Sequence, residues 1–395
     1  MAIVFVMALS WLTLRVNAES TDTINKSLDN ITVSLITCYP GEEIYELCGH
    51  SAIRVRGENI DSVWNYGIFD FNQPNFVYRF VKGETDYKGA SYPFRWFLPE
   101  YVEAGRRVVE QDLNLTPGEA QSLLAVLRQS VLPENATYRY NYVKDNCSTR
   151  ILNHIDTATG GSVIYPDTVR YGTFRKEMEA YHANYPWYQF GIDLALGSGL
   201  DYPVSAREEM FVPVEMMNQA AHASFSDGRP FVKATRVLNE GKPSAVLPPT
   251  PWYLSPLFWA WILAVLIILI TGYNLYNNKL FLPIYGVWFF ILGLVGLLEA
   301  FLVFISVHEA SSPNILILWL NPFQWMFSVS VYVRRLRPLA LFMAWYNIIV
   351  IGAMILVSPF LTQSLNLAFY PLLLSTFVLA LAYAIIRYKT SYKRR

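Results

Sequence analysis

A cysteine stands at the junction between a polar and an amphipathic stretch in YRYNYVKDNCSTRILNHID, residues 138–156. A thiol becomes a good nucleophile when its pKa is lowered, and a helix N-terminus or a nearby imidazole can lower it. The spacing after Cys147 predicts an amphipathic helix that begins at or near this residue. The chemistry indicated is therefore nucleophilic attack by a thiolate. The alternative is a small buried side chain with no reaction to perform, which is common for free cysteines.

An imidazole partner for this thiol has to come from one of five histidines in the chain. His154 lies two turns along the same predicted helix and points back poorly, whereas His182 and His222 lie in polar, loop-like sequence. His50 opens the alternating stretch GHSAIRVRG directly after Gly49, where another group can approach a strand closely. A histidine at the mouth of a strand and a cysteine at the start of a helix make a papain-like pair. We therefore expect His50 to be the base.

A third polar group should orient the imidazole, and we expect it from the next strand, VWNYGIFD. Asn65 is preferred over Asp70 because it lies mid-strand, and the alternative is that Asn65 only satisfies local backbone groups. Asp145 and Asn146 precede the cysteine. Asp145 is expected to cap the helix, whereas Asn146 either caps it or contributes to an oxyanion site.

Three further residues near the predicted pair are candidates for substrate binding or support. Arg54 and Arg150 flank the pair and carry the charge needed to meet a phosphate group. The alternative for each arginine is an exposed position or a structural ion pair. Tyr66 follows Asn65 on the same predicted strand and is included as a supporting residue.

The other two cysteines bear on whether Cys147 is free. Cys38 and Cys48 are separated by ten positions across the tight turn at Pro40-Gly41, so a disulfide between them is geometrically easy. An exported domain meets an oxidising environment, where an unpaired thiol needs a reason. A Cys38–Cys48 bridge would leave Cys147 as the free thiol, and the alternative is that all three are unpaired and buried.

Export is indicated by the N-terminus, in which an apolar stretch is followed by small residues and resembles a signal peptide over residues 1–18. An uncleaved anchor is the alternative, although the stretch is short for crossing a bilayer. The whole chain is 53% hydrophobic, only 16% charged, and has a formal net charge of zero, so no basic field suggests nucleic acid. Charges are spread through residues 19–250 and are rare in residues 251–395.

The apolar third contains segments long enough to cross a bilayer, at about 254–276, 280–306, 314–333, 338–358 and 366–387. Lys279, three arginines at 334–338 and five basic residues in the tail lie on one side of this five-helix arrangement. The opposite turns, 307–313 and 359–365, contain no Lys or Arg. The positive-inside rule therefore predicts a cytoplasmic C-terminus and an exported 19–250 domain.

Hydrophobic periodicity predicts the elements that position the Cys–His pair. Alternation over NITVSLITCYP, GHSAIRVRG and DSVWNYGIFDF predicts three strands, and LTPGEAQSLLAVLRQSVL predicts a helix capped by Thr116. Residues 184–250, rich in Tyr, Pro, Gly and Trp, are expected to be strand and loop. The fold class is α+β. Zinc-binding cysteine pairs, H-E-x-x-H, P-loop and G-x-S-x-G motifs are absent, so neither a metal nor a soluble cofactor is expected.

Several long motifs occur in order along the chain: TCYPGEEIYELCGHSAIRV, VWNYGIFDFNQPNFVYRFVKGETDYKGAS, YNYVKDNCSTR, FGIDLALGSGLDYPVSAREEMFVPVEM and HEASSPNILILWLNP. They resemble the Lnb family of lipoprotein N-acyltransferases of Bacteroidetes, and the resemblance covers about residues 30–390. The resemblance implies a circularly permuted papain-like (NlpC/P60-like) periplasmic domain, 19–250, followed by a five-helix transmembrane domain, 251–395. It implies that Cys147 is the nucleophile and His50 the base. A Cys38–Cys48 bridge would be particular to this chain, because Cys48 stands where an aromatic residue is expected.

Two polar residues in the apolar third gain a predicted role from the same resemblance. Glu299 lies within GLVGLLEAFLVF, and a carboxylate inside a membrane span is costly unless it has a function. His308 lies in the short exported turn HEASSPN, where it could close over the active site. The alternative for His308 is an ordinary solvated turn.

The function implied is acyl transfer between membrane lipids. Cys147 would take an acyl chain from a glycerophospholipid as a thioester and pass it to the α-amine of a diacylglyceryl-cysteine lipoprotein, in a ping-pong reaction at the inner membrane. The alternative is a membrane-anchored cell-wall cysteine peptidase or amidase of the NlpC/P60 type, although such an enzyme needs one anchor rather than five spans. A non-enzymatic binding scaffold is a third reading.

Overall fold

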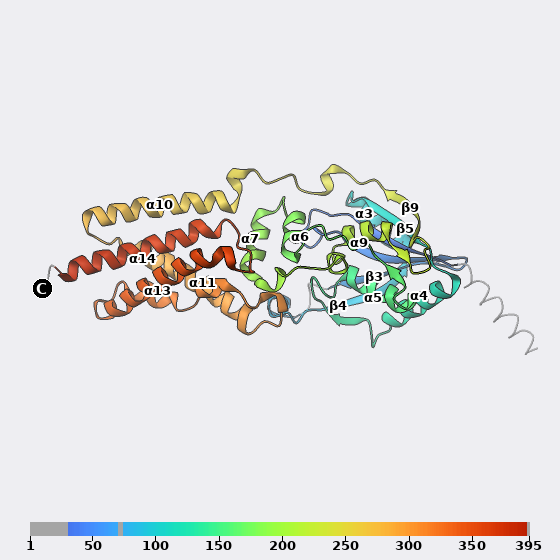
Figure 1. Cartoon of the computed structure of the whole chain (residues 1–395), viewed down its shortest axis with the longest axis horizontal. Coiled ribbons are helices and arrows are strands. Elements are labelled where there is room, and N and C mark those ends of the chain that lie inside the picture. The colour runs from blue at the N-terminus through green and yellow to red at the C-terminus, as the bar shows by residue number, and fades with distance from the viewer. Residues whose placement is uncertain (1–30, 70–73, 393–395) are drawn as a thin grey trace, which may run out of the picture. The chain divides into compact units, whose positions relative to one another are not determined.

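The computed structural model describes residues 31–69 and 74–392, so the signal-peptide prediction and Asp70 lie outside the described residues. The chain divides into two compact units (Figure 1). The first comprises Met1–Gln73, Thr85–Gly172 and Val204–Leu247, and the second Pro74–Glu84, Thr173–Pro203 and Pro248–Arg395. The sequence predicted a domain continuous from 19 to 250, whereas 74–84 and 173–203 pack with the apolar helices of the second unit.

The first unit is built on an antiparallel sheet, seven-stranded in the described part of the chain, with strand order β6-β4-β3-β2-β1-β5-β9. The strands are β1 (Thr32–Cys38), β2 (His50–Gly57), β3 (Ile60–Ile68), β4 (Asp86–Pro93), β5 (Val108–Leu113), β6 (Thr137–Arg139) and β9 (Val232–Asn239). Strands β1, β2 and β3 confirm the three alternating stretches predicted. A short pair, β7 (Val163–Ile164) with β8 (Ser224–Phe225), stands apart from this sheet.

Helices cover both faces of this sheet because successive residues of its central strands point in opposite directions. Leu35, Ile53 and Trp64 pack in the core shared with α4 (Pro117–Ser130), α5 (Cys147–Thr159) and α9 (Pro213–His222). Ile36 and Ala52 point the other way, into a smaller core with α3 (Phe94–Glu103). Helix α5 contacts β2 and β3, which brings its first turn to the strand that begins with a histidine.

The two helices expected in the first unit are confirmed, but the region 184–250 is more helical than predicted. Thr116 caps α4 and forms a capping box with Glu119. Residues predicted as strand and loop instead form α7 (Pro186–Ala195), α8 (Ala206–Glu209) and α9 before strand β9. Pro186 and Pro213 lie at the helix starts, where proline is favoured, so the prolines that suggested loop mark helix starts here.

The second unit contains four helices that are long and apolar enough to cross a membrane, counted over the described residues. They are α10 (Pro256–Asn277), α11 (Leu282–Phe304), a span over Arg334–Phe360 containing α13 (Arg337–Val357), and Phe369–Lys389 within α14 (Phe369–Tyr392). Figure 1 shows these helices side by side. Three shorter helices, α2 (Phe76–Lys82), α6 (Phe174–Tyr181) and α7, belong to the same unit.

The predicted fifth span, 314–333, is wrong as a continuous helix. It forms a 3-10 turn at Ile315–Leu318 and the short helix α12 (Gln324–Ser330), with Asn321-Pro322 between them. Proline lacks the N–H that a continuing helix needs, and the buried side chains of Asn321 and Gln324 hydrogen-bond to local carbonyls instead.

This interrupted segment runs alongside α11 in the opposite direction. Three glycines of α11, Gly296, Gly293 and Gly286, lie in turn against Asn321, Trp325 and Tyr332. Three side chains of the segment donate to carbonyls of α11: Trp325 Nε1 to Phe290 at 3.0 Å, Ser328 Oγ to Gly286 at 2.7 Å and Tyr332 OH to Leu282 at 3.2 Å. Small residues at such a contact let two backbones approach closely within a bilayer.

Candidate active site

Cys147 is the first residue of α5, and Asn146 holds that end of the helix in place. The Asn146 Oδ1 accepts from the backbone N–H groups of Ser148 at 2.9 Å and Thr149 at 3.0 Å. Its Nδ2 donates to the carbonyl oxygens of Tyr142 at 2.8 Å and Phe211 at 2.9 Å. The Asn146 side chain is therefore committed to capping rather than to an oxyanion site. The backbone N–H of Cys147, at the first helical position, lies outside the helix's own hydrogen bonds.

Asp145 does not cap α5, which corrects the expectation from the sequence. Its carboxylate pairs with the guanidinium of Arg150, one turn into the helix, at 2.8 Å. The Arg150 guanidinium also lies 3.4 Å from the centre of the Tyr138 ring. A short polar residue directly before a helix and one two positions before it look alike in sequence. Here the helix begins at Cys147, so Asn146 occupies the cap position and Asp145 precedes it.

His50 is the first residue of β2 and is held by a hydrogen-bonded chain. Its Nε2 lies 2.6 Å from Asn65 Oδ1, and Asn65 Nδ2 donates to the Tyr92 hydroxyl at 2.9 Å. Because the amide nitrogen of Asn65 is used by Tyr92, the amide oxygen faces His50 and must accept from Nε2–H. The other ring nitrogen, Nδ1, is then the one available to the thiol. The imidazole also stacks on Tyr101 of α3, with ring centres 6.3 Å apart and planes 9° apart.

The electrostatics of Cys147 and His50 favour a thiolate–imidazolium pair. Burial alone would raise the pKa of Cys147, but the adjacent His50 and hydrogen bonds from the Ser51 backbone and the Ser148 side chain lower it below its ordinary value. Burial acts to lower the pKa of His50, yet the Cys147 thiolate and the hydrogen bond with Asn65 raise it. Each partner therefore stabilises the charged form of the other.

The backbone around the thiol is shaped by β3. The pairing of β3 with β4 shifts register between Asn65 and Ile68. Gly67 lies within this irregularity at φ +88°, a conformation that favours glycine, and a Cβ there would lie 3.9 Å from the Cβ of Cys147. On the other side, the hydroxyls of Ser51 and Ser148 share a hydrogen bond of 3.1 Å that joins β2 to α5.

The suggested Cys38–Cys48 disulfide is absent, because both cysteines are free thiols with different surroundings. Cys38 is fully buried at the end of β1, in the core with α3, and burial raises its pKa well above the ordinary range. The Sγ of Cys48 lies 3.2 Å from the hydroxyl of Tyr142. The two thiols therefore face different neighbours despite the short loop between them.

The other candidates near the pair have structural partners. Arg54 bonds Asp61 at 2.7 Å and Glu110 at 3.3 Å, so its guanidinium is already engaged by carboxylates, as is that of Arg150. Tyr66 is buried and shares a 2.7 Å hydrogen bond with the Ser130 hydroxyl. The ring of His154 packs against the ring of Tyr66. Burial and the nearby Arg150 lower the pKa of His154 to about 4, so this histidine stays neutral.

Glu299 and His308 belong to the second unit. Glu299 is fully buried in α11, where its Oε2 accepts from Asn314 Nδ2 at 3.1 Å and Gln363 in turn donates to Asn314 at 2.9 Å. His308 Nε2 lies 2.8 Å from the carbonyl oxygen of Phe80 in α2. Both residues therefore have polar partners within the second unit.

The sequence indicated neither Tyr92 nor the Ser51–Ser148 contact. Tyr92 reaches Asn65 only because of the particular β3–β4 register, in which Val63 lies opposite Tyr92. A tyrosine at an alternating position of a strand gives no signal of such a role. The serines that follow His50 and Cys147 were a weak signal of the contact between them.

Comparison with known protein families identifies both parts of the chain. The family model described as the Lnb N-terminal periplasmic domain matches residues 19–175, and the one described as the Lnb transmembrane domain matches residues 249–391. No curated protein and no solved structure matches the chain. The two matches lie in the order of the family and together cover most of the sequence, so this chain belongs to the Lnb family.

Proposed function

We propose that this protein is a lipoprotein N-acyltransferase. The observation that carries the proposal is the Cys147–His50–Asn65 chain at the meeting point of α5, β2 and β3. It occurs in a chain whose matched regions are a periplasmic domain and a membrane domain of the Lnb family. A thiolate with an oriented imidazole suits acyl transfer through a thioester, and membrane helices suit substrates that are lipids.

In the first half-reaction, the Cys147 thiolate attacks the ester carbonyl of a glycerophospholipid. The backbone N–H of Cys147, at the start of α5, is placed to stabilise the oxyanion that forms. When the tetrahedral intermediate collapses, the C–O ester bond breaks and the His50 imidazolium donates its Nδ1 proton to the leaving alkoxide. A lysophospholipid departs, and Cys147 carries the acyl chain as a thioester.

In the second half-reaction, the α-amine of a diacylglyceryl-cysteine lipoprotein attacks this thioester. Neutral His50 accepts a proton from the amine as the C–N bond forms. Collapse breaks the C–S bond, releases the N-acylated lipoprotein and regenerates the thiolate–imidazolium pair. Asn65 acts as a positioning residue throughout, because its Oδ1 keeps the proton on Nε2 and leaves Nδ1 for the exchange.

We also propose that the periplasmic part has a circularly permuted papain-like fold. In this chain the strand that carries the histidine precedes the helix that carries the cysteine, and β3 supplies the orienting amide. We further propose that the protein resides in the inner membrane with its C-terminus in the cytoplasm, as the distribution of Lys and Arg between the turns favours.

Mass spectrometry of lipoprotein N-termini tests the proposal. The full chain is expressed in a bacterial strain that lacks lipoprotein N-acylation, and wild type is expected to restore the third acyl chain. Cys147→Ser and His50→Ala should each abolish it, whereas Cys48→Ser, which changes a thiol outside the pair, should retain it. An acyl thioester on Cys147, trapped with a labelled phospholipid, would support the first half-reaction. Unacylated N-termini with wild type present would reject the function.

A further inference from the structure

The connection between β3 and β4 contains a helix that does not belong to the sheet. Helix α2 lies between Asn65 on β3 and Tyr92 on β4 in the sequence, yet it is part of the second unit with α11. We infer that α2 is an interfacial helix that lies in the lipid headgroup layer beside the C-terminal end of α11, so that this connection is anchored to the membrane surface.

Helix α2 is fixed to α11 and the turn after it by several contacts. The Val307 N–H donates to the Lys82 carbonyl at 2.8 Å, and Ser306 Oγ donates to the Val81 carbonyl at 2.9 Å. The rings of Tyr78 and Phe301 have centres 6.0 Å apart. Together with the His308–Phe80 contact, these interactions involve residues from Tyr78 to Lys82 of α2. These contacts therefore fix the position of α2 at the end of α11.

The turn that follows α2 depends on a close approach of two backbones. Gly83 has φ +79°, and a Cβ at this position would lie 3.0 Å from the backbone nitrogen of His308. A glycine at this position permits the left-handed conformation. It also leaves room for residues 306–308 to approach the end of α2. The chain thus brings α2 against the end of α11 at a site that few other residues would allow.

Three of the seven side chains of α2 are exposed, namely Val77, Tyr78 and Phe80, and the other four, which include Arg79 and Lys82, are half-buried. Val77 is 73% exposed and Phe80 is 50% exposed, and Phe304 at the end of α11 is 74% exposed. No residue of α2 is buried. A short helix that leaves its apolar side chains uncovered in water would be unfavourable, since contiguous exposed apolar groups mark an interaction site.

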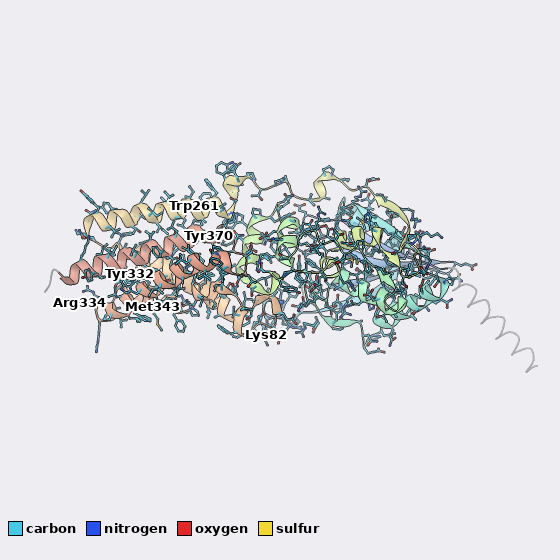
Figure 2. All side chains as sticks on the ribbon, viewed as in Figure 1. Lys82, Trp261, Tyr332, Arg334, Met343 and Tyr370 are labelled. Atoms are coloured by element: carbon cyan, nitrogen blue, oxygen red, sulfur yellow. The ribbon has the colours of Figure 1, made fainter. Side chains whose placement is uncertain are left out.

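A lipid surface is the occupant that fits this patch. Helix α2 contacts Phe301 and residues 306–308, and the exposed apolar residues Phe304, Ile305 and Val307 lie in this same stretch at the end of a helix long enough to span a bilayer. Lys82 lies at the opposite end of the helix bundle from Arg334 (Figure 2). Tyrosine and lysine are suited to the headgroup layer because each combines an apolar stem with a polar tip. Tyr78 and Lys82 supply both types here, with the Lys82 ammonium 5.9 Å from the Tyr78 ring centre.

Photo-crosslinking to lipid tests this placement without relying on activity. A benzophenone amino acid is introduced at Val77 of the full chain, which is then reconstituted in phosphatidylethanolamine–phosphatidylglycerol nanodiscs containing an alkyne-tagged phospholipid. The matched control carries the probe at Ile164 in β7, an apolar residue that is 57% exposed in the first unit. A probe at Val287 of α11, also exposed, sets the yield for a position inside the bilayer.

Lipid adducts at position 77 are expected to exceed those at 164 by about fivefold or more, as for a helix whose apolar face enters the headgroup layer. Equal yields at 77 and 164 would overturn the inference. Adducts to another protein chain at 77 without lipid adducts would overturn it in favour of a protein partner. Because the readout is lipid contact, it is independent of whether the chain transfers acyl groups.

Discussion

The three cysteines of this chain show how surroundings decide the chemistry of a thiol. Cys38 is enclosed by apolar side chains, and its raised pKa makes it unreactive. Cys48 contacts the hydroxyl of Tyr142. Cys147 combines a helix start with an adjacent histidine, and its pKa is lowered. The surroundings therefore favour Cys147 as the proposed nucleophile, although the residue type is the same at all three positions.

The pairing of Cys147 with His50 predicts a pH dependence of thiol alkylation. The pKa of Cys147 is lowered from its ordinary value of 9.0, so the thiolate should persist as the pH falls below that value. In His50→Ala the stabilising charge is lost while burial remains, so the midpoint of alkylation should move to higher pH. Rates of iodoacetamide reaction at Cys147, followed by peptide mass spectrometry between pH 5 and 10, would measure both midpoints.

Asn65→Ala provides the companion measurement for this pH profile. This substitution leaves His50 in place but removes a hydrogen bond that raises the pKa of the imidazole. The pH midpoint of Cys147 alkylation in Asn65→Ala should therefore fall between those of wild type and His50→Ala. An identical midpoint in wild type and His50→Ala would show that His50 does not stabilise the thiolate, and the proposed base would have to be sought elsewhere.

The proximity of Cys147 and His50 could be predicted from the sequence because both residues stand at element boundaries that periodicity reveals. Cys147 precedes an amphipathic helix and His50 precedes an alternating strand. The choice of Asn65 followed from its mid-strand position. Tyr92 could not be found in the same way, since its contact with Asn65 depends on a register that is shifted within the same pair of strands. Local patterns predict elements, whereas contacts between strands also require their alignment.

At the scale of single elements, the start of α5 holds both the helix cap, Asn146, and the proposed nucleophile, Cys147. The Asn146 Oδ1 accepts from backbone N–H groups of the first turn, and its Nδ2 joins the helix start to the carbonyls of Tyr142 and Phe211. The thiol position is therefore fixed by this cap as much as by the helix itself. Residues within a turn of a nucleophile are easily assigned to catalysis from sequence alone, and here the neighbouring asparagine is structural.

Asn146→Ala should destabilise the protein by about 1–2 kcal/mol, because it removes the cap and leaves buried carbonyl groups unpaired. The apparent melting temperature of the full chain in detergent should fall by roughly 2–8 °C. Asp145→Ala removes a partly exposed ion pair and should change the melting temperature by less than about 2 °C. Thermal unfolding of both variants would measure the two melting temperatures. Equal decreases would show that the Asn146 cap stabilises the protein no more than the Asp145–Arg150 ion pair does.

The interrupted segment 314–333 shows the limit of composition as a guide to helices. Its hydropathy predicted a span, but Pro322 and the buried polar side chains around it end each helical piece early. The polar groups are satisfied by the segment itself and by carbonyls of α11. Such irregular backbone is tolerated in a bilayer where protein covers it.

At the scale of the whole molecule, each compact unit is assembled from segments that are not continuous in the sequence. Residues 74–84 and 173–203 precede the membrane helices in the chain but pack with them. Within the second unit, Arg175 of α6 is fully buried and bonds Asp193 and Asp201, and Asn366 before α14 donates to Asp193 at 2.8 Å. Buried ion pairs between distant segments leave no periodic signal, so this division was not predictable from composition.

The contact between α2 and α11 provides a second argument for the membrane topology. Helix α2 lies within the residues matched by the periplasmic family model, so the C-terminal end of α11 that it touches should face the periplasm. The N-terminal end of α11, after Lys279, then faces the cytoplasm. If the interrupted segment 314–333 returns across the bilayer along α11, the three arginines at 334–337 also reach the cytoplasmic side.

Substituted cysteines distinguish a complete crossing from a re-entrant loop. In a Cys48→Ser, Cys147→Ser background, Leu132→Cys and Glu309→Cys should react with a membrane-impermeant maleimide in intact spheroplasts, since both lie in parts assigned to the periplasm. Arg335→Cys should react only after permeabilisation, because the segment that runs from Asn321 to Tyr332 along α11 carries the chain to the other face. Labelling of Arg335→Cys in intact spheroplasts would mean that the segment turns back, and the C-terminus would then lie in the periplasm.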